Sequence, residues 1–510
     1  MEEKCLKTNI YLNDVLFCDS TEQAIDIDFT LPDFCPDISK IYKCRAVPRI
    51  SSKGIDGKSI TVDGAVVITL IYCDKDGNLS SYDYQYPFSK TLDMSEECAG
   101  ANICCKAKCE YINCRAVTGR KVDIHGAVGI FLKVFKRKCT DIISDYDDTN
   151  IELLRGTAPA TMPMGYAEKY IVIEEDVLIG QGLDSIGNII RCDAVSCVKE
   201  TKVMAGKTVV KGEINMSIIY CSQMGGNIQS LKTSLPFSQI IDVEGITDAC
   251  ECETKSEIAF FEAKPKMTSS EETRCFSVTA KVLLSCEAYC PNDVEVILDA
   301  FSRKYKSEIT KSKVSLDKIT ENVSEIFHTK KNIELDDSIT SVIDLWCAMS
   351  SVATRFEQEN MVINGTLVCG MIVRTEKEND VYCEKTIDFQ YKYPFKNELG
   401  TPHCEPKIEV ISCGYTIMSP ENIEIRADIS INAAIYETNE MSLITGVNVD
   451  ENTPITEHSK TALTIYFPSK DECVWDIARI YKASVEEIMR INSLESDKLK
   501  PGKMILVPVM

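Results

Sequence analysis

The sequence predicts a mainly β protein: three repeated antiparallel β-rich modules, sandwich-like in form, followed by a small βααβ domain. Three observations carry this prediction. Apolar and polar residues alternate through much of the chain up to residue 460, one unit recurs three times, and residues 462–510 change to a helical periodicity. A chain of 510 residues is also too long for one hydrophobic core, so several domains are expected.

The alternation is clearest in residues 423–436. Isoleucines and alanines occupy every second position from Ile423 to Ile435, and polar residues such as Glu424 and Asp428 fill positions between them. Successive side chains of a strand point to opposite faces, so this pattern indicates a strand with one buried and one solvated face. Such strands are typical of antiparallel sheets.

The recurring unit begins with a glycine inside an apolar run and ends with a Pro-Phe step. Its copies are residues 64–88, 212–237 and 365–395, and the greater length of the third is assigned to a charged loop around residues 376–380. Repetition of this kind indicates one supersecondary unit used three times. Glycine weakens a strand interior, so Gly64, Gly212 and Gly365 predict bulges or close backbone approach. The Pro-Phe step is expected to end an edge strand and bury its ring.

These repeats divide the chain into domains. We place their limits at residues 1–155, 156–310 and 311–458, with the small C-terminal domain at 462–510. The polar segments 141–160 and 304–331 lie between the modules. The end of the second has helical or strand potential through Val323, Ile326 and Phe327, so it is expected to feed the third module. The net charge of −22 lies upstream of residue 462, because acidic and basic residues balance in the last domain. That shift in charge supports the last boundary.

Composition and charge exclude several classes of partner. Strong acidity disfavours nucleic acid and anionic membranes, because phosphate groups are bound by clustered lysine and arginine. No apolar run reaches the roughly 18 to 20 residues of a transmembrane helix, and no apolar signal segment follows Met1. We therefore expect a cytoplasmic protein without a transmembrane segment, whose 25 cysteines are reduced thiols.

No catalytic, metal or cofactor site is recognisable. The four histidines do not pair at metal-ligand spacing, and the cysteines form no repeated Cys-x-x-Cys pair. Gly206-Lys207-Thr208 resembles the end of a phosphate-binding loop, but its leading glycine is missing and a strand-like run follows. We expect no enzyme, no cofactor and no metal. A carboxylate-dependent hydrolase hidden in the repeats is kept as an alternative.

The C-terminal domain shows a different periodicity. Val474, Ile477, Ala478 and Tyr481 follow helical spacing and form one apolar stripe. A second helix is expected from Ser484, with Glu487 three residues on as a capping box. Short strands are expected at residues 463–467 and 504–508. The order is β-α-α-β, and the two strands are free to pair.

At these residues the chain resembles the LysM family. The resemblance is carried by residues 474–478, Tyr481, residues 484–488, Ile491-Asn492, Leu494 and residues 499–508. It implies a domain that typically binds N-acetylglucosamine glycans such as peptidoglycan. The family's glycan-side loop usually reads Gly-Asp-Thr, whereas this chain has Asp471, Glu472 and Cys473. This departure favours a protein partner, with peptidoglycan as the alternative.

Partner binding is predicted for five residues of this domain: Trp475, Leu463, Asp471, Glu472 and Cys473. Trp475 lies one residue off the apolar stripe, about 100° round the helix, so a partly exposed face is expected. It is either a structural tryptophan at the core edge or an anchor for another protein, because aromatic residues are enriched in binding hot spots. Leu463 could extend the same patch.

The whole chain resembles the SipL-like spore coat morphogenetic proteins of clostridial spore-forming bacteria, which join β-rich modules to a terminal LysM domain. The resemblance implies a non-enzymatic scaffold of spore coat assembly, made in the mother-cell cytoplasm and recruited to the forespore surface. Its LysM domain would dock there on the coat morphogenetic ATPase SpoIVA. The alternative is a peptidoglycan-binding protein of the spore cortex or cell wall.

Overall fold

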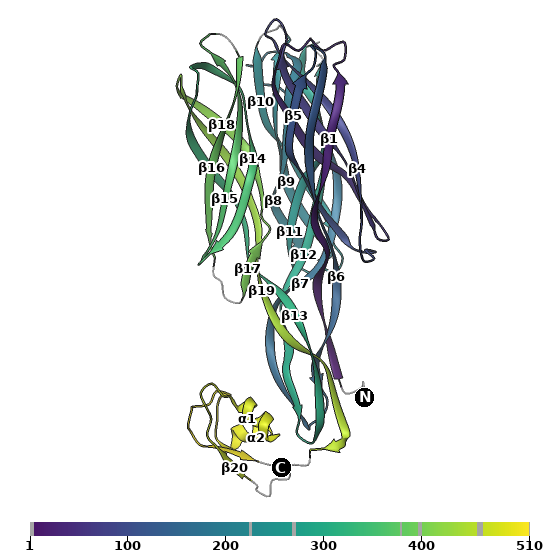
Figure 1. The fold of residues 1–510 in the computed structure, drawn as a ribbon, viewed down its shortest axis with the longest axis vertical. Helices are drawn as coiled ribbons and strands as arrows, with labels where there is room; N and C mark the ends of the chain where they lie inside the picture. Colours follow the sequence, from purple (N-terminus) through teal and green to yellow (C-terminus); the bar gives the residue numbers. More distant parts are fainter. Residues whose placement is uncertain are drawn as a thin grey trace.

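The computed structural model describes residues 5–223, 227–267, 272–377, 380–395, 400–455 and 463–508. Strands dominate them and the two short helices lie near the C-terminal end, which confirms the predicted fold class. Three groups of strands, which we call modules 1, 2 and 3, stand side by side in Figure 1. Long strands continue below them as a stalk, and the C-terminal domain lies beside the foot of this stalk.

Module 1 is a sandwich of two antiparallel sheets. Its strands are β1 (Cys5–Thr30), β2 (Lys40–Asp56), β3 (Ser59–Cys73), β4 (Leu79–Asp93), β5 (Asn102–Ala116) and β6 (Lys121–Tyr146). The sheet orders are β1-β6-β5 and β2-β3-β4. Alternate side chains of the two sheets, such as Ile27, Val66 and Ile124, share one core.

Module 2 repeats this arrangement. Its strands are β7 (Ile151–Leu178), β8 (Ile186–Met204), β9 (Lys207–Ser222), β10 (Ile228–Asp242), β11 (Glu251–Met267) and β12 (Thr273–Ser302). The sheet orders β7-β12-β11 and β8-β9-β10 correspond strand by strand to those of module 1.

Module 3 repeats it again with one added short strand. Its strands are β13 (Tyr305–Glu334), β14 (Ile339–Glu357), β15 (Asn360–Thr375), β16 (Asp380–Pro394), β17 (Thr401–Cys404), β18 (Lys407–Ser419) and β19 (Asn422–Pro454). One sheet is β14-β15-β16, and in the other β19 pairs with β13, β17 and β18.

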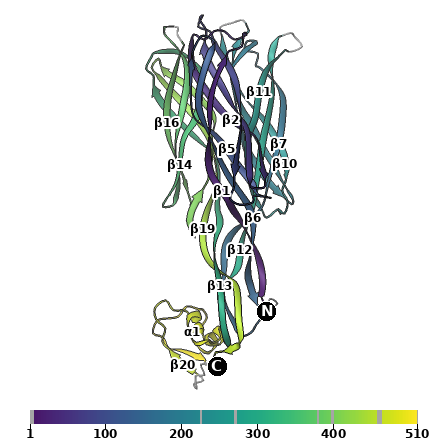
Figure 2. The same cartoon turned by 45° about the vertical axis from the view of Figure 1, so that its right-hand side comes forward.

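The polar segments 141–160 and 304–331 are mostly strand, and the modules are connected only at the short turns between β6 and β7 and between β12 and β13. The second segment feeds module 3 as β13, as expected. The two segments lie in β6, β7 and β13, which run on into the stalk that Figure 2 shows as long, twisting strands. Ile142, Ala158 and Val314 from these segments pack with Ile10 and Val296 in a core shared by all three modules. Each strand contributes few apolar residues to this core, so the alternation of apolar and polar residues is weak in the sequence of these segments.

The repeated glycines each lie beneath an aromatic ring of the neighbouring strand. Gly64 pairs with Phe88, Gly212 with Phe237, and Gly365 with Phe389. The prediction of close approach is therefore confirmed. Two details were wrong. The Pro-Phe steps of the first two copies lie inside β4 and β10 and do not end them. In the third copy the equivalent ring is Phe389, not Phe395, so the charged loop is not the cause of the extra length.

Replacing Gly365 by alanine is expected to destabilise module 3 by about 1–3 kcal/mol, because overpacking forces neighbours off their preferred rotamers. A Cβ there would lie 2.5 Å from two ring atoms of Phe389. Gly414→Ala is the matched control, since nothing lies within 4 Å of a Cβ at that position of β18. Denaturant unfolding of the two variants measures the difference, and equal midpoints would contradict the packing role.

The modules meet in a cyclic order. The edge strand β4 contacts β8, the equivalent β10 contacts β14, and β16 contacts β2, so each module presents the same edge to the next. Apolar residues at this junction include Ile71, Ile219 and Ile372, which occupy equivalent positions. The three modules therefore form a ring with approximate threefold symmetry.

An ion pair at the centre of this ring uses equivalent positions of two modules. Arg191 of β8 donates two hydrogen bonds to the Asp344 carboxylate of β14, at 2.7 and 2.8 Å, and the two side chains are 3% and 1% exposed. Arg191 also pairs with Asp193, which Arg45 of module 1 contacts at 3.0 Å. Burial opposes ionisation of Asp193, but Arg45 and Arg191 outweigh it and lower its pKa to about 2. One charged cluster thus joins all three modules.

Candidate functional sites

The C-terminal domain has the predicted β-α-α-β order. Its elements are β20 (Leu463–Tyr466), α1 (Val474–Tyr481), α2 (Val485–Ile491) and β21 (Ile505–Pro508). The two strands pair antiparallel, and the helical stripe supplies the core through Val474, Ile477 and Ala478. Ser484 caps α2 by accepting a hydrogen bond from the backbone N–H of Glu487. The β-α-α-β order and the Ser484 N-cap are confirmed, whereas the capping box appears at α1, between Cys473 and Asp476.

One face of the small β20–β21 sheet is apolar and exposed. Leu463, Ile465 and Phe467 alternate along this edge of the domain and are 50%, 57% and 60% exposed. Leu506 and Pro508 stand opposite Ile465 and Leu463 in the register. We call these five residues the outer sheet face. A contiguous apolar patch of this kind marks an interaction surface more often than scattered exposed residues do.

Trp475 does not belong to this exposed surface, and the expectation of a partly exposed ring is wrong. The side chain is only 5% exposed. It packs against Phe301 of β12 with ring centroids 5.0 Å apart, and its indole Nε1 donates a 3.1 Å hydrogen bond to Asp299. The Trp475 ring is covered by residues at the foot of the stalk, which are distant in sequence. Helical spacing alone could therefore not predict that Trp475 is buried.

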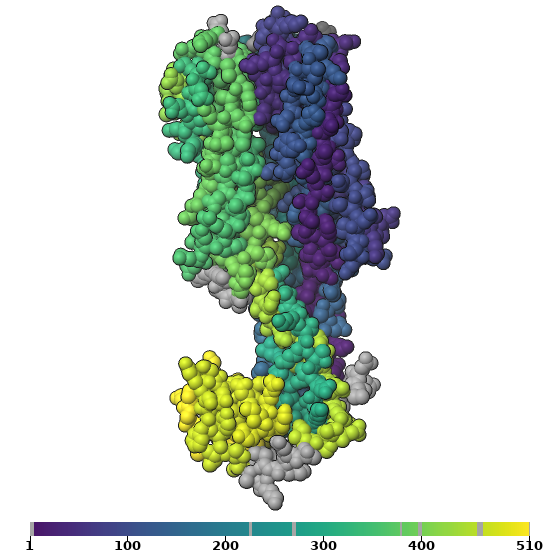
Figure 3. Space-filling view, in the orientation of Figure 1, coloured from purple at the N-terminus to yellow at the C-terminus, as the bar shows by residue number. Residues whose placement is uncertain are grey.

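Asp299 of β12 is the centre of this contact between the C-terminal domain and the stalk, which is visible in Figure 3. Besides Trp475 it accepts a hydrogen bond from Arg479 of α1 at 2.9 Å and pairs with Lys311 of β13 at 2.9 Å. Burial raises the cost of its charge, but the bonds from Lys311 and Trp475 outweigh burial and lower the pKa of Asp299. Lys482 lies over the Phe301 ring, 5.3 Å from its centroid.

Replacing Asp299 by alanine is expected to weaken this contact by about 1–3 kcal/mol, because the buried indole N–H loses its acceptor. The chain has two tryptophans, so a Trp346→Phe background reports on Trp475 alone. Asp299→Ala should shift its fluorescence to longer wavelength and increase quenching by acrylamide. Asp293→Ala removes an exposed carboxylate of the same strand and is the control. Unchanged fluorescence in Asp299→Ala would contradict the contact.

The three predicted loop residues lie between β20 and α1. Glu472 accepts hydrogen bonds from the Tyr466 hydroxyl at 3.0 Å and from the Ser469 backbone N–H at 2.8 Å. Cys473 precedes α1, and its backbone N–H donates to Asp476 at 3.0 Å. Asp471 is exposed and has φ of 68°, a backbone region that favours glycine. Glu472 and Cys473 therefore brace the loop from within.

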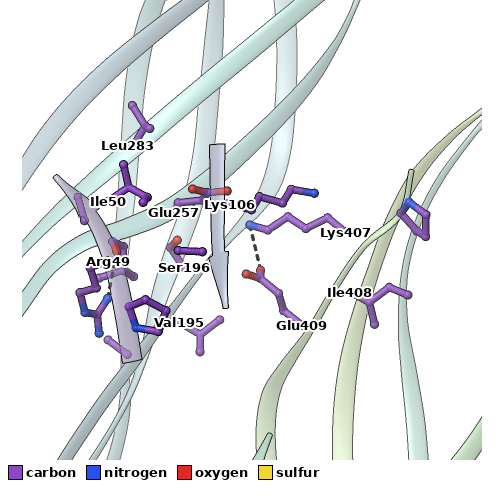
Figure 4. A pocket seen from close by; sticks show the side chains of 16 residues that line it. Arg49, Ile50, Lys106, Val195, Ser196, Glu257, Leu283, Lys407, Ile408 and Glu409 are labelled. Carbon is purple, nitrogen blue, oxygen red and sulfur yellow. Dashed lines mark hydrogen bonds and ion pairs between the residues drawn. The ribbon is translucent and has the colours of Figure 1, made fainter. Parts of the chain in front are cut away.

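A second candidate site is a cavity of about 370 Å³ where all three modules meet (Figure 4). Its charged lining comes from Arg49 and Lys106 of module 1, Glu257 of module 2, and Lys407 and Glu409 of module 3. These residues carry no motif that the sequence alone would identify. The signal available was the repeat itself, because Lys106 and Lys407 lie in the equivalent strands β5 and β18.

The groups in this cavity link the modules to one another. Arg49 donates to the Ile258 carbonyl at 3.0 Å, and Lys407 donates to the Ser256 carbonyl. Lys407 also pairs with Glu409 at 3.0 Å, and burial raises the pKa of the Glu409 carboxyl. Two carboxylates are the minimal set for acid–base hydrolysis. Here Lys407 holds one of them, Glu409, and the bonds to the carbonyls of Ile258 and Ser256 join separate modules.

Among the residues that the structure describes, no group of three or more histidine, cysteine, aspartate or glutamate side chains is placed to hold a metal ion. Neither helix in the described part of the chain is long and apolar enough to cross a bilayer.

Comparison with known families gives three matches. The SipL, SPOCS domain model matches residues 37–117 and 185–266, which contain β2–β5 of module 1 and the equivalent β8–β11 of module 2. The LysM domain model matches residues 470–508. Both are non-catalytic binding domains. No curated protein and no solved structure matches the chain.

The repeated unit and the terminal domain thus each carry a family assignment of their own. The two SPOCS matches fall on equivalent strands, and the LysM match falls on the β-α-α-β domain. The chain is a SipL-like, sporulation-related protein with SPOCS domains and a C-terminal LysM domain.

Proposed function

We propose that this protein is a non-enzymatic scaffold of spore coat assembly. Three modules, which begin at β1, β7 and β13, supply a rigid body, and the LysM domain at 462–510 docks on a protein. The partner that fits the family resemblance is the coat morphogenetic ATPase SpoIVA. This chain would be made in the mother-cell cytoplasm and would bind SpoIVA at the forespore surface. The observation that carries the proposal is the outer sheet face.

The composition of that face favours a protein over a glycan. Leu463, Ile465 and Phe467 offer apolar area without the polar groups that fix sugar hydroxyls, and apolar patches are typical of protein interfaces. In the loop where the LysM family binds glycan, Glu472 and Cys473 are already hydrogen bonded within the domain. A sugar would have to compete with those bonds.

The five predicted partner-binding residues then have different roles in docking. Leu463 lies on the docking surface. Asp471 is exposed in the loop between β20 and α1, and its charge would steer association. Trp475, Glu472 and Cys473 hold the LysM domain in shape and against the stalk, so they act on binding through the position of the outer sheet face.

The experiment that separates the two candidate functions uses the full chain. Capture of purified SpoIVA-type ATPase by the immobilised protein is expected, together with little retention on purified peptidoglycan in a sedimentation assay. Strong, saturable retention on peptidoglycan without ATPase capture would reverse the ranking in favour of the glycan-binding alternative.

A further inference from the structure

Three cysteine side chains meet inside module 3. Cys347 of β14 stands opposite Cys369 of β15 in the register, and their sulfur atoms are 3.0 Å apart. Cys413 belongs to β18 of the facing sheet, and its thiol donates to the backbone carbonyl of Leu345 on β14 at 3.6 Å. Cys413 therefore lies against β14, two residues from Cys347.

Two of these thiols can be reached from a cavity between modules 2 and 3. The cavity has a volume of about 330 Å³, and both Cys347 and Cys413 line it, whereas Cys369 is fully buried and does not. Lys232 and Arg191 of module 2 line the same cavity. The Lys232 ammonium donates to the backbone carbonyl of Cys413 at 2.6 Å.

The surroundings favour the thiolate form of Cys413. A hydrogen bond from the Cys347 thiol, together with the charges of Lys232 and Arg191, outweighs burial and lowers the pKa of Cys413 to about 7. The thiolate is the nucleophilic form of cysteine, and attack is fastest when its pKa is near the ambient pH.

We propose that Cys413 and Cys347 form a redox-sensitive thiol pair, which closes into a disulfide between the two sheets of module 3 when a low-molecular-weight disulfide enters the cavity. Cys413 is the attacking group because it is activated and lines the cavity. Cys347 is the resolving group because it is the other thiol that lines the cavity, on the strand against which Cys413 lies.

The chemistry consists of two exchange steps. The Cys413 thiolate attacks one sulfur of the reagent, forming a mixed disulfide and releasing one thiolate. Cys347 then gives up its proton to the medium and attacks the Cys413 sulfur, which forms the Cys347–Cys413 bond and expels the second thiolate. Two protein thiols are oxidised, and one reagent disulfide is reduced to two thiols.

The product would join β14 to β18 and so fix one sheet of the sandwich on the other. A cross-link between segments far apart in sequence restricts the unfolded chain and stabilises the fold. The scaffold would then be stronger in a more oxidising environment than in the reducing one where it is made.

The test treats the folded full chain with oxidised glutathione and analyses it by intact mass and peptide mapping. We expect a mass loss of about 2 Da for the closed pair and a Cys347–Cys413 linked peptide. Cys347→Ser should stop at the mixed disulfide on Cys413, and Cys413→Ser should prevent closure. Cys369→Ser should leave closure intact. Circular dichroism checks that each variant is folded.

Two sets of cysteines serve as internal controls. Cys44 of β2 and Cys114 of β5 also belong to the two facing sheets of module 1, but neither lines the cavities described above. We expect this pair to stay reduced under the same conditions. Exposed Cys18 and Cys139 report simple accessibility and should form mixed disulfides only.

Two results would overturn the proposal. One is an unmodified Cys413 after Cys18 and Cys139 have reacted, and the other is an intramolecular disulfide that maps to a different pair. Neither outcome touches the scaffold function, because the docking surface lies on another domain.

Discussion

Leu463→Arg is expected to lower the affinity of the full chain for its protein partner by about tenfold or more, which is the loss typical of a hot-spot residue. Leu463 is half exposed at the edge of the outer sheet face, so the LysM core does not depend on its side chain. A charged guanidinium there would be desolvated against the partner's apolar surface without a counter-charge. Titration calorimetry with the SpoIVA-type ATPase measures the change.

Ile480→Arg is the matched control for this prediction. Ile480 is another large, exposed apolar residue of the LysM domain, but it lies on α1 and not on the outer sheet face. The same charge at that position should leave affinity within about twofold of the unaltered chain. Equal losses in the two variants would place the interface elsewhere on the domain.

Arg191→Met is expected to destabilise the ring by about 3–5 kcal/mol, the largest stability effect predicted here, because it leaves a buried carboxylate without its counter-ion. Asp344 is almost fully buried, and Arg191 donates both hydrogen bonds that hold it. Asp193 would be affected less, since Arg45 remains beside it. The midpoint of denaturant unfolding gives the measurement.

A double variant tests whether the unpaired charge of Asp344 causes this loss of stability. Adding Asp344→Leu to Arg191→Met removes the stranded charge, so stability should return to within about 1–2 kcal/mol of the unaltered chain. A double variant as unstable as Arg191→Met alone would show that packing around the guanidinium matters, and not its charge.

The fold class, the repeat and the LysM helices could be predicted because each rests on local patterns. Alternation at residues 423–436 marks a half-buried strand wherever the chain places it, and the stripe from Val474 to Tyr481 marks a helix face. The repeated glycines were also visible locally, although the aromatic partner of Gly365 was not. A Pro-Phe step suggested Phe395, whereas the strand register selects Phe389.

The features that escaped prediction depend on contacts between modules. Trp475 is covered by Asp299 and Phe301, which lie far away in the sequence on the stalk. The cavity where the three modules meet is formed by strands that only the ring of modules brings together. The thiol pair likewise depends on the packing of the two sheets of module 3. Of the predicted site, Leu463 is exposed as expected, and Trp475 is not.

The most direct test of the central claim, that the outer sheet face grips another protein, is site-specific photo-crosslinking. A benzoyl-phenylalanine in place of Ile465 in the full chain should crosslink to the SpoIVA-type ATPase, and the same group in place of Ile480 should not. Crosslinking from position 480 alone, or from neither position while the complex still forms, would contradict the docking surface described here.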